Sequence, residues 1–212
     1  MTRYIDYDAL TAATLETDPY DHGVVPGWIP ADPLRAINES YPDISHAGNE
    51  SLSSLSASGA FAEFVEEIQG PRFAESLGNL FDLDLSRSPS RITVRRFAES
   101  SDGHIHTDHR SKTITVLFYF NEEWGETAGN LRLLRADTDI EDYTVEVPPY
   151  GGTMLAFRRT DHSFHGHLPF VGERRTLQLN FLRAGPVSLL HQGFDRMSTR
   201  VMKGTLRLLN RS

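Results

Sequence analysis

The sequence predicts a single α+β domain in which helices come first and an antiparallel double sheet follows. Apolar residues recur at helical spacing through the first ~85 residues and at a spacing of two from residue 91 onward. The strands after that point are short, are separated by turns rich in Gly and Pro, and have no helices between them. This order favours a jelly-roll or sandwich over a parallel sheet. The length of 212 residues is sufficient for one domain with its own core.

The first part of the chain contains three helical patterns. Asp32 has the properties of an N-cap residue, because Pro33 follows it and apolar residues then recur at helical spacing. Residues 60–68 carry an apolar stripe at the same spacing. Gly70-Pro71 ends that helix and begins the next one, which is expected over residues 71–81.

The strands are predicted from β-branched and aromatic runs that turn residues interrupt. Residues 23–29 are expected to form an edge strand ahead of the helices, and the serine-rich residues 51–58 a surface loop. From residue 91 the sheet begins, and Gly172-Glu173 is one of the turns within it. After this first strand, further strands are expected over residues 113–120, 131–134, 143–147, 153–157 and 176–182.

Composition excludes several classes of function. The chain has no cysteine, which removes disulfides, thiolate metal sites and cysteine nucleophiles. The formal net charge of −8 disfavours binding to a phosphate backbone, so nucleic acid is not an expected partner. We find no apolar run near the ~18 residues that a membrane span needs, and no apolar segment typical of a secretory signal. These features favour a cytoplasmic protein with no membrane partner.

Histidines cluster in a way that suggests a metal site. Six of the nine histidines fall in two short windows, near residues 104–109 and 162–167. The first window contains His106-Thr107-Asp108, and on an extended strand the first and third of these side chains share a face. A histidine from the second window would complete a set of two histidines and one carboxylate, which leaves half of an octahedral shell open in non-haem iron oxygenases. On its own, a His-x-Asp pattern more often forms a hydrogen-bonded loop.

An arginine follows the second histidine window. Nine residues after His165, Arg174 opens a strongly apolar strand. A guanidinium at the start of an interior strand is costly to bury unless it meets an anion. A dicarboxylate held by a bidentate contact would be such an anion.

The second half of the sequence resembles a known family, the prolyl 4-hydroxylase-like branch of the Fe(II)/2-oxoglutarate-dependent oxygenases. The resemblance covers residues 92–182 and rests on the order and spacing of several segments. These segments are HTD at 106–108, KTITVLFYFNEEW at 112–124, GNLR at 129–132, PPYGGTMLAF at 148–157, SFHGHLP at 163–169 and ERRTLQLNF at 173–181. The resemblance implies a double-stranded β-helix (jelly-roll, cupin-like) core with the N-terminal helices packed on it.

The resemblance also implies a set of site residues. It assigns Fe(II) to His106, Asp108 and His165. It assigns 2-oxoglutarate to Arg174, Tyr119, Thr176 and Leu131, with Arg174 on the far carboxylate. No catalytic residue beyond the metal ligands is implied, because the metal and its cosubstrate supply the oxidising chemistry.

Two assignments leave alternatives open. Arg175 adjoins Arg174, and a shift of one residue would exchange them. Strand parity favours Arg174, which shares a face with Thr176, whereas Arg175 shares a face with apolar residues. His162 and His167 are alternatives to His165, and His167 is also a candidate on the substrate side.

The function that the resemblance implies is hydroxylation of an unactivated C–H bond with release of succinate and CO2. The expected cofactors are Fe(II), 2-oxoglutarate and O2, with ascorbate as an optional reductant. The expected substrate is a small molecule or a group tethered to a carrier or peptide. The alternatives are a protein-directed prolyl hydroxylase, a metal enzyme of the cupin type without 2-oxoglutarate, and a β-helix module that binds metal or ligand without turnover.

The remaining expectations concern domain organisation and the substrate. We expect a helical lead-in over residues 1–88, a β-helix core over residues 89–185, and an amphipathic basic helix over residues 190–210 that docks on the core or mediates a homodimer. Arg95 and Arg96, on the strand that leads to the first histidine window, are candidates for an anionic group of the substrate. An exposed strand face is the simpler interpretation of this pair, and of the two we name Arg96 as the weak candidate.

Overall fold

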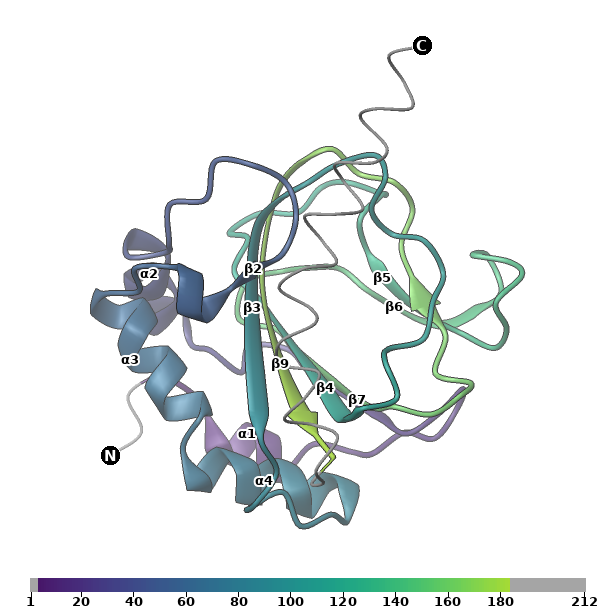
Figure 1. Cartoon of the computed structure of the whole chain (residues 1–212), viewed down its shortest axis with the longest axis horizontal. Helices are drawn as coiled ribbons and strands as arrows, with labels where there is room; N and C mark the ends of the chain where they lie inside the picture. The colour runs from purple at the N-terminus through teal and green to yellow at the C-terminus, as the bar shows by residue number, and fades with distance from the viewer. Residues whose placement is uncertain (1–3, 184–212) are drawn as a thin grey trace.

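A computed structural model describes residues 4–183 of the chain. Within them, two antiparallel sheets face each other, and four α-helices cover the outer face of the larger sheet (Figure 1). In chain order the elements are α1 (Tyr7–Thr11), β1 (His22–Val25), α2 (Ala31–Glu39), β2 (Glu50–Ser51), a 3-10 turn (Leu52–Ser54), α3 (Gly59–Ile68), α4 (Pro71–Phe81), β3 (Ser90–Ala98), β4 (Lys112–Tyr119), β5 (Leu131–Leu134), β6 (Tyr143–Val147), β7 (Met154–Arg158), β8 (His165–Gly166) and β9 (Gly172–Leu182).

The larger sheet has six strands in the order β1-β7-β4-β9-β3-β2. Strand β4 shows how its two faces differ, because alternate side chains of a strand point to opposite sides. Its Ile114, Val116 and Phe118 lie in the main core under the helices. Thr115 and Tyr119 are buried on the opposite face. The polar and functional groups therefore collect on the face that looks toward the smaller sheet.

An aromatic core joins the helices to the larger sheet. The ring of Phe118 lies 5.2 Å from Trp28, 5.6 Å from Phe64 and 6.0 Å from Phe73, measured between ring centres. All four side chains are fully buried. Buried aromatic side chains remove large apolar areas from water, so this cluster anchors the helices to the sheet.

The smaller sheet has the order β6-β5-β8 and covers the other face. A second apolar cluster lies between the sheets and includes Leu131 and Leu133 of β5 and Leu155 and Phe157 of β7. Two facing antiparallel sheets of this kind form the double-stranded β-helix expected from the sequence. Strand β8 is only two residues long, and it pairs with β5 at Leu133 and His165.

Most of the expected elements are confirmed. The strands over residues 131–134 and 143–147 agree with β5 and β6 at both ends, and the helices expected over residues 60–68 and 71–81 agree with α3 and α4 within one residue. The edge strand expected over residues 23–29 is confirmed in part as β1, which lies at one end of the larger sheet and ends at Val25. The helix α1 and the strands β2 and β8 were not expected.

Three local predictions were wrong. Helix α2 begins at Ala31 with Pro30 at the N-cap position, so Asp32 lies inside its first turn and pairs with Arg35. The residues Gly172-Glu173 belong to β9 and do not form a turn. The serine-rich segment is not entirely a loop, because residues 51–54 contain the end of β2 and the 3-10 turn.

Strand β9 carries a bulge at its two arginines. Arg95 pairs with Thr176 and Phe97 with Glu173, so Arg174 and Arg175 together lie opposite one residue of β3. A bulge of this kind bends the strand and redirects a side chain.

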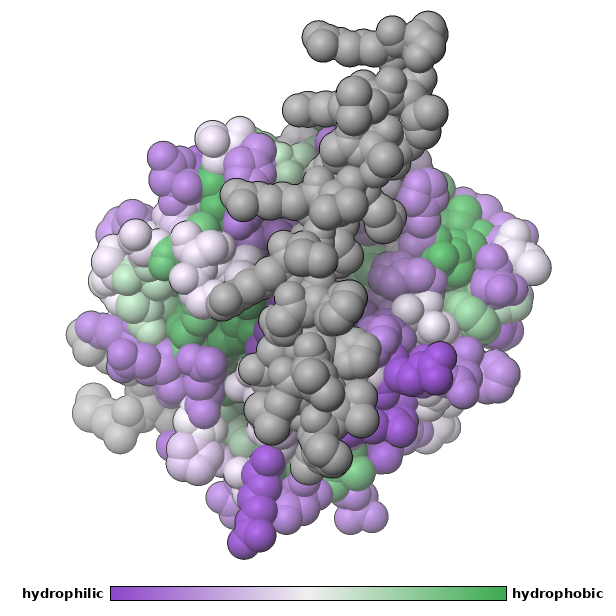
Figure 2. Space-filling view, in the orientation of Figure 1, coloured by the Kyte–Doolittle hydropathy of each residue, from purple (hydrophilic) through white to green (hydrophobic). Residues whose placement is uncertain are grey.

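The visible surface of the described residues is mainly hydrophilic, and its apolar residues form small separate areas (Figure 2). Tyr150 and Val171 are the large apolar side chains that are exposed among residues 4–183. No helix in this range is long and apolar enough to cross a membrane. The predicted helix over residues 190–210, and the dimer contact that it suggested, lie outside the described residues and stay predictions.

Candidate metal centre and cosubstrate pocket

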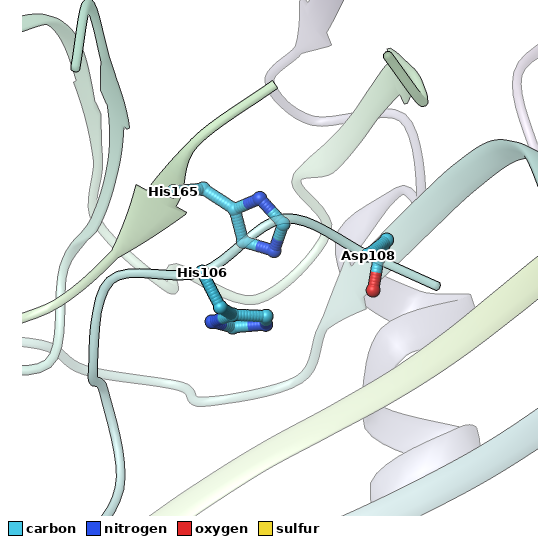
Figure 3. Close-up of side chains that lie close together, drawn as sticks. All are labelled: His106, Asp108 and His165. Carbon is cyan, nitrogen blue, oxygen red and sulfur yellow. The ribbon is translucent and has the colours of Figure 1, made fainter. Parts of the chain in front are cut away.

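Three side chains form a compact group between the two sheets. One ligand atom from each of His106, Asp108 and His165 lies within 4.8 Å of the others. His165 extends from β8, while His106 and Asp108 extend from the segment before β4 (Figure 3). This is the set of two histidines and one carboxylate that the sequence singled out, and it fits a metal ion that keeps open coordination positions.

Backbone pairing holds the two histidines together. His106 N–H donates to His165 O and His165 N–H donates to His106 O, each at 3.0 Å. The ring centres are 4.4 Å apart. The expectation that His106 lies on a strand holds only for this isolated bridge, because Thr107 and Asp108 belong to no strand. The local pairing with His165 brings the two windows together instead.

Each histidine presents its Nε2 atom to the metal position. His106 Nδ1 lies 2.8 Å from His104 O, and His165 Nδ1 lies 3.0 Å from Ser163 O. A carbonyl only accepts, so Nδ1 carries the proton in both rings and Nε2 keeps its lone pair. Burial lowers the pKa of His165 to about 4, so this ring is neutral near neutral pH. A neutral imidazole is the form that binds a metal ion.

The Asp108 carboxylate is held at both oxygens. Lys112 Nζ lies 2.5 Å from Oδ1, and Thr115 Oγ1 donates to Oδ2 at 2.5 Å. Burial raises the pKa of Asp108, but Lys112, His165 and the two hydrogen bonds outweigh burial and hold the pKa below its usual value. The group is therefore ionised, and each oxygen has a second lone pair for a metal ion. Thr115 is in turn 3.2 Å from Asn180 Oδ1.

Removing the Thr115 hydroxyl is expected to weaken metal binding without removing a ligand. Groups that orient a metal ligand typically contribute 10- to 100-fold in affinity, so Thr115→Val should raise the dissociation constant for Fe(II) by roughly that factor. Thr113→Val is the matched control, because the Thr113 side chain makes no hydrogen bond to another described residue. Anaerobic titration with Fe(II) measures both variants. Equal affinities would contradict a positioning role for Thr115.

A cavity of about 300 Å³ is lined by the triad and by residues of strand β9. Arg174 lines it and is 6% exposed, with Nε donating to Gly129 O at 2.9 Å and Nη1 to Thr176 Oγ1 at 3.3 Å. Both partners are neutral, and no carboxylate of residues 4–183 forms a salt bridge with this guanidinium. Because an unpaired buried charge is costly, the site fits an anionic ligand at this position.

Tyr119 supplies a second group beside Arg174. The Arg174 guanidinium lies 5.6 Å from the centre of the Tyr119 ring. The Tyr119 hydroxyl is fully buried and has no hydrogen-bond partner among the described residues. A buried hydroxyl and a buried guanidinium side by side fit the far carboxylate of 2-oxoglutarate. Leu131 and Thr176 line the same cavity.

The structure separates the two adjacent arginines. Arg174 faces the cavity, whereas Arg175 points to the other side of β9, where its Nε lies 2.8 Å from Glu173 Oε1 and its guanidinium lies 5.6 Å from the centre of the Tyr41 ring. Strand parity therefore predicted the orientation correctly. The role of Arg174 toward 2-oxoglutarate stays a prediction.

Of the other candidate site residues, His167 lines the cavity, whereas His162 and Arg96 do not. His167 is buried and lines the cavity but does not belong to the metal-ligand group, and His162 is exposed. Arg96 does not line the cavity, because it pairs with Glu173 and Asp43. The arginine that does line it is its neighbour Arg95. The position of Arg96 therefore does not support the prediction that it binds an anionic group of the substrate.

Sequence reasoning did not find the residues that support the site. Lys112 and Thr115 hold Asp108 directly, and Asn180 lies beside the Thr115 hydroxyl. The available signal was polarity within otherwise apolar strands, since Thr115 and Asn180 are buried polar residues on the face opposite the main core. Asp102, which lines the cavity, had no such signal because it lies in a loop.

Comparisons with known proteins support this geometry. Residues 92–182 match the model of the 2OG-Fe(II) oxygenase superfamily. No curated protein matches the chain. Among solved structures, a prolyl-4-hydroxylase from Pseudomonas putida is 18% identical with a TM-score of 0.59, over 84% of this chain and 97% of that one.

Two further solved structures have the same fold. A prolyl 4-hydroxylase from Phytophthora capsici is 18% identical with a TM-score of 0.56, over 95% of this chain and 77% of that one. HygX from Streptomyces hygroscopicus, with nickel and 2-oxoglutarate bound, is 12% identical with a TM-score of 0.51, over 77% of this chain and 82% of that one. At these identities the likeness shows a shared fold. The match over residues 92–182 includes all three residues of the candidate metal group, so this part of the chain is similar to the 2OG-Fe(II) oxygenase superfamily.

Proposed function

We propose that this protein is an Fe(II)- and 2-oxoglutarate-dependent oxygenase that hydroxylates an unactivated C–H bond of a small or tethered substrate. The observation that carries the proposal is that the triad of His106, Asp108 and His165 lines the same cavity as the buried Arg174. In the overall reaction one oxygen atom of O2 enters the substrate and the other enters succinate, and 2-oxoglutarate loses CO2.

The chain's own residues have three tasks in this reaction. His106, Asp108 and His165 would hold Fe(II) and leave positions open on one side, where iron with 2-oxoglutarate and O2 supplies the oxidising chemistry. Arg174 and Tyr119 would orient 2-oxoglutarate by its far carboxylate. Apolar side chains such as Leu131 and Phe157, which line the cavity, exclude water from the reacting groups.

The alternatives make different demands on the same residues. A cupin-type metal enzyme without 2-oxoglutarate does not explain why Arg174 is buried without a carboxylate partner. A non-catalytic module would bind both ligands but form no succinate. A prolyl hydroxylase that acts on proteins uses the same metal chemistry, and the activity in the names of the P. putida and P. capsici structures belongs to those proteins.

An anaerobic titration tests the proposal. Fe(II) is added to metal-free protein, 2-oxoglutarate follows, and the absorbance is recorded for the weak visible charge-transfer band of the chelated complex. The band is expected, followed by succinate formation when O2 is admitted. If Fe(II) binds but 2-oxoglutarate gives no band, a metal enzyme of the cupin type takes the place of this proposal. A band without succinate would instead support the non-catalytic module.

A further inference from the structure

A second arginine lines the cavity, and the roles proposed above for the metal and for 2-oxoglutarate do not include it. Arg95 of β3 lines the cavity together with Asp102, and their side chains are 15% and 17% exposed. Arg95 pairs across the sheet with Thr176, two residues from Arg174. Its position therefore borders the cosubstrate pocket on the neighbouring strand.

Two hydrogen bonds hold the Arg95 guanidinium in place, and some of its N–H groups remain free to bind a ligand. Its Nη1 lies 2.6 Å from Asp102 Oδ2, and its Nε donates to Asn49 Oδ1 at 3.0 Å. These bonds use two of the five N–H groups of a guanidinium. Within residues 4–183 the other N–H groups have no acceptor. A donor edge is thus fixed in place and available to a ligand.

Asp102 likewise uses only one of its two carboxylate oxygens within the described residues. Its Oδ2 accepts from Glu99 N–H at 2.9 Å as well as from Arg95, whereas Oδ1 receives no hydrogen bond from the described residues. The adjoining Gly103 has a φ of +95° and lies so close to the residue after β8 that an added Cβ would be 2.3 Å from His167 O. The His167 N–H donates to Gly103 O at 2.9 Å. Asp102 therefore stands at a defined position at the cavity.

The two groups together select for a ligand with two opposite charges. A lone carboxylate on Arg95 would lie beside the free oxygen of Asp102, and a lone ammonium on Asp102 would lie beside the guanidinium. Like charges placed side by side are costly in a binding site. A ligand that carries a carboxylate and an ammonium on neighbouring atoms satisfies both groups, since each charge then meets its opposite.

Cavity size points to a small ligand. The volume of about 300 Å³ is at the lower end of the range for small-molecule sites, and 2-oxoglutarate would occupy part of it. We propose that Arg95 and Asp102 form a subsite for the carboxylate and the ammonium of a zwitterion, so that the substrate is a free α-amino acid. This inference rests on the proposed oxygenase function.

A substrate series tests the inference. Each proteinogenic L-amino acid is incubated with the Fe(II)-loaded protein, 2-oxoglutarate and O2, and succinate formed above the rate without amino acid is measured. We expect at least one free amino acid to be turned over. Its Nα-acetyl and α-amide derivatives, which each lack one charge, should lose roughly 10- to 100-fold in kcat/KM. Turnover of these derivatives as good as that of the free amino acid would overturn the subsite.

Variants locate the effect in the chain. Arg95→Gln removes the charge of the guanidinium, and we expect it to raise KM for the amino acid roughly 10- to 100-fold. Arg96→Gln is the matched control with an unchanged KM, because Arg96 lies outside the cavity lining and pairs with Glu173 and Asp43. Asp102→Asn removes the negative charge that would meet the ammonium. We therefore expect it to reduce the ratio of kcat/KM for the free amino acid to kcat/KM for its Nα-acetyl derivative. Equal KM values for Arg95→Gln and Arg96→Gln would overturn the assignment.

The anaerobic band separates this inference from the function on which it rests. If the band forms and no free amino acid is turned over, the zwitterion subsite is wrong and the oxygenase proposal stands. If the band does not form, both fall. A peptide that is turned over when free amino acids are not would identify a protein-directed enzyme and would also overturn the subsite.

Discussion

Replacing His165 with Ala is expected to abolish succinate formation from 2-oxoglutarate, whereas replacing His162 with Ala leaves it at the wild-type rate. His165 is buried in the triad, and its ring centre lies 4.4 Å from that of His106. Without its Nε2 atom, the metal position keeps only His106 and Asp108. His162 lies three residues before His165, in the turn ahead of β8, and is exposed and does not line the cavity.

The measurement combines succinate formation with Fe(II) binding. We expect His165→Ala to lose both, and the anaerobic 2-oxoglutarate band with them. His165 also packs on Phe157, with ring centres 4.8 Å apart, so truncation leaves a void. His165→Phe keeps a ring of similar size without a ligand atom, and it should be as inactive as His165→Ala. Succinate formation by a folded His165→Phe protein would remove His165 from the ligand set.

The β-sheets were predicted well because period and composition agree in these strands. Strand β4 consists mainly of β-branched and aromatic residues, which predict a strand, and Thr115 between Ile114 and Val116 marks its two faces. The ends of β5 and β6 were found because turn residues bound them on both sides.

Local signals were insufficient where tertiary pairing decides the structure. Strand β8 contains only His165 and Gly166, and it exists because it pairs with β5 and His106. The N-cap at Asp32 was wrong because a capping preference contributes only about 1 kcal/mol, and helix α2 begins one residue before Asp32. The bulge that places both Arg174 and Arg175 opposite one residue of β3 leaves no mark in the sequence.

In the site, too, the sequence predicted some residues and missed those that depend on tertiary contacts. The resemblance and the His-x-Asp spacing named the three side chains that the structure brings together. The partners of Arg95 were beyond reach, because Asn49 is 46 residues away in the sequence and Asp102 lies in a loop without periodic pattern. Contacts between residues that are far apart in the sequence depend on the order of the strands in the sheet, and a single sequence does not give this order.

The second large effect concerns Arg174. Replacing it with Gln is expected to raise KM for 2-oxoglutarate by roughly two to three orders of magnitude, because a broken buried ion pair typically costs 3–5 kcal/mol. The reason is its environment: the guanidinium is 6% exposed, has neutral partners only, and therefore depends on the ligand for its counter-charge.

Arg175→Gln is the matched control for this effect. Its guanidinium already has a carboxylate partner in Glu173, which is 42% exposed, and a surface ion pair of this kind contributes at most about 1 kcal/mol. We therefore expect Arg175→Gln to keep the wild-type KM for 2-oxoglutarate. The two variants differ by one position and remove the same charge, so overall charge cannot account for a difference between them.

A titration of 2-oxoglutarate against succinate formation measures both variants. Fe(II) affinity in the absence of 2-oxoglutarate should be the same in Arg174→Gln and wild type, since Arg174 does not belong to the metal-ligand group. A rise in KM with unchanged metal affinity would place Arg174 on the cosubstrate. The reverse pattern, with KM raised in Arg175→Gln alone, would mean that the anion binds on the outer side of β9, away from the triad.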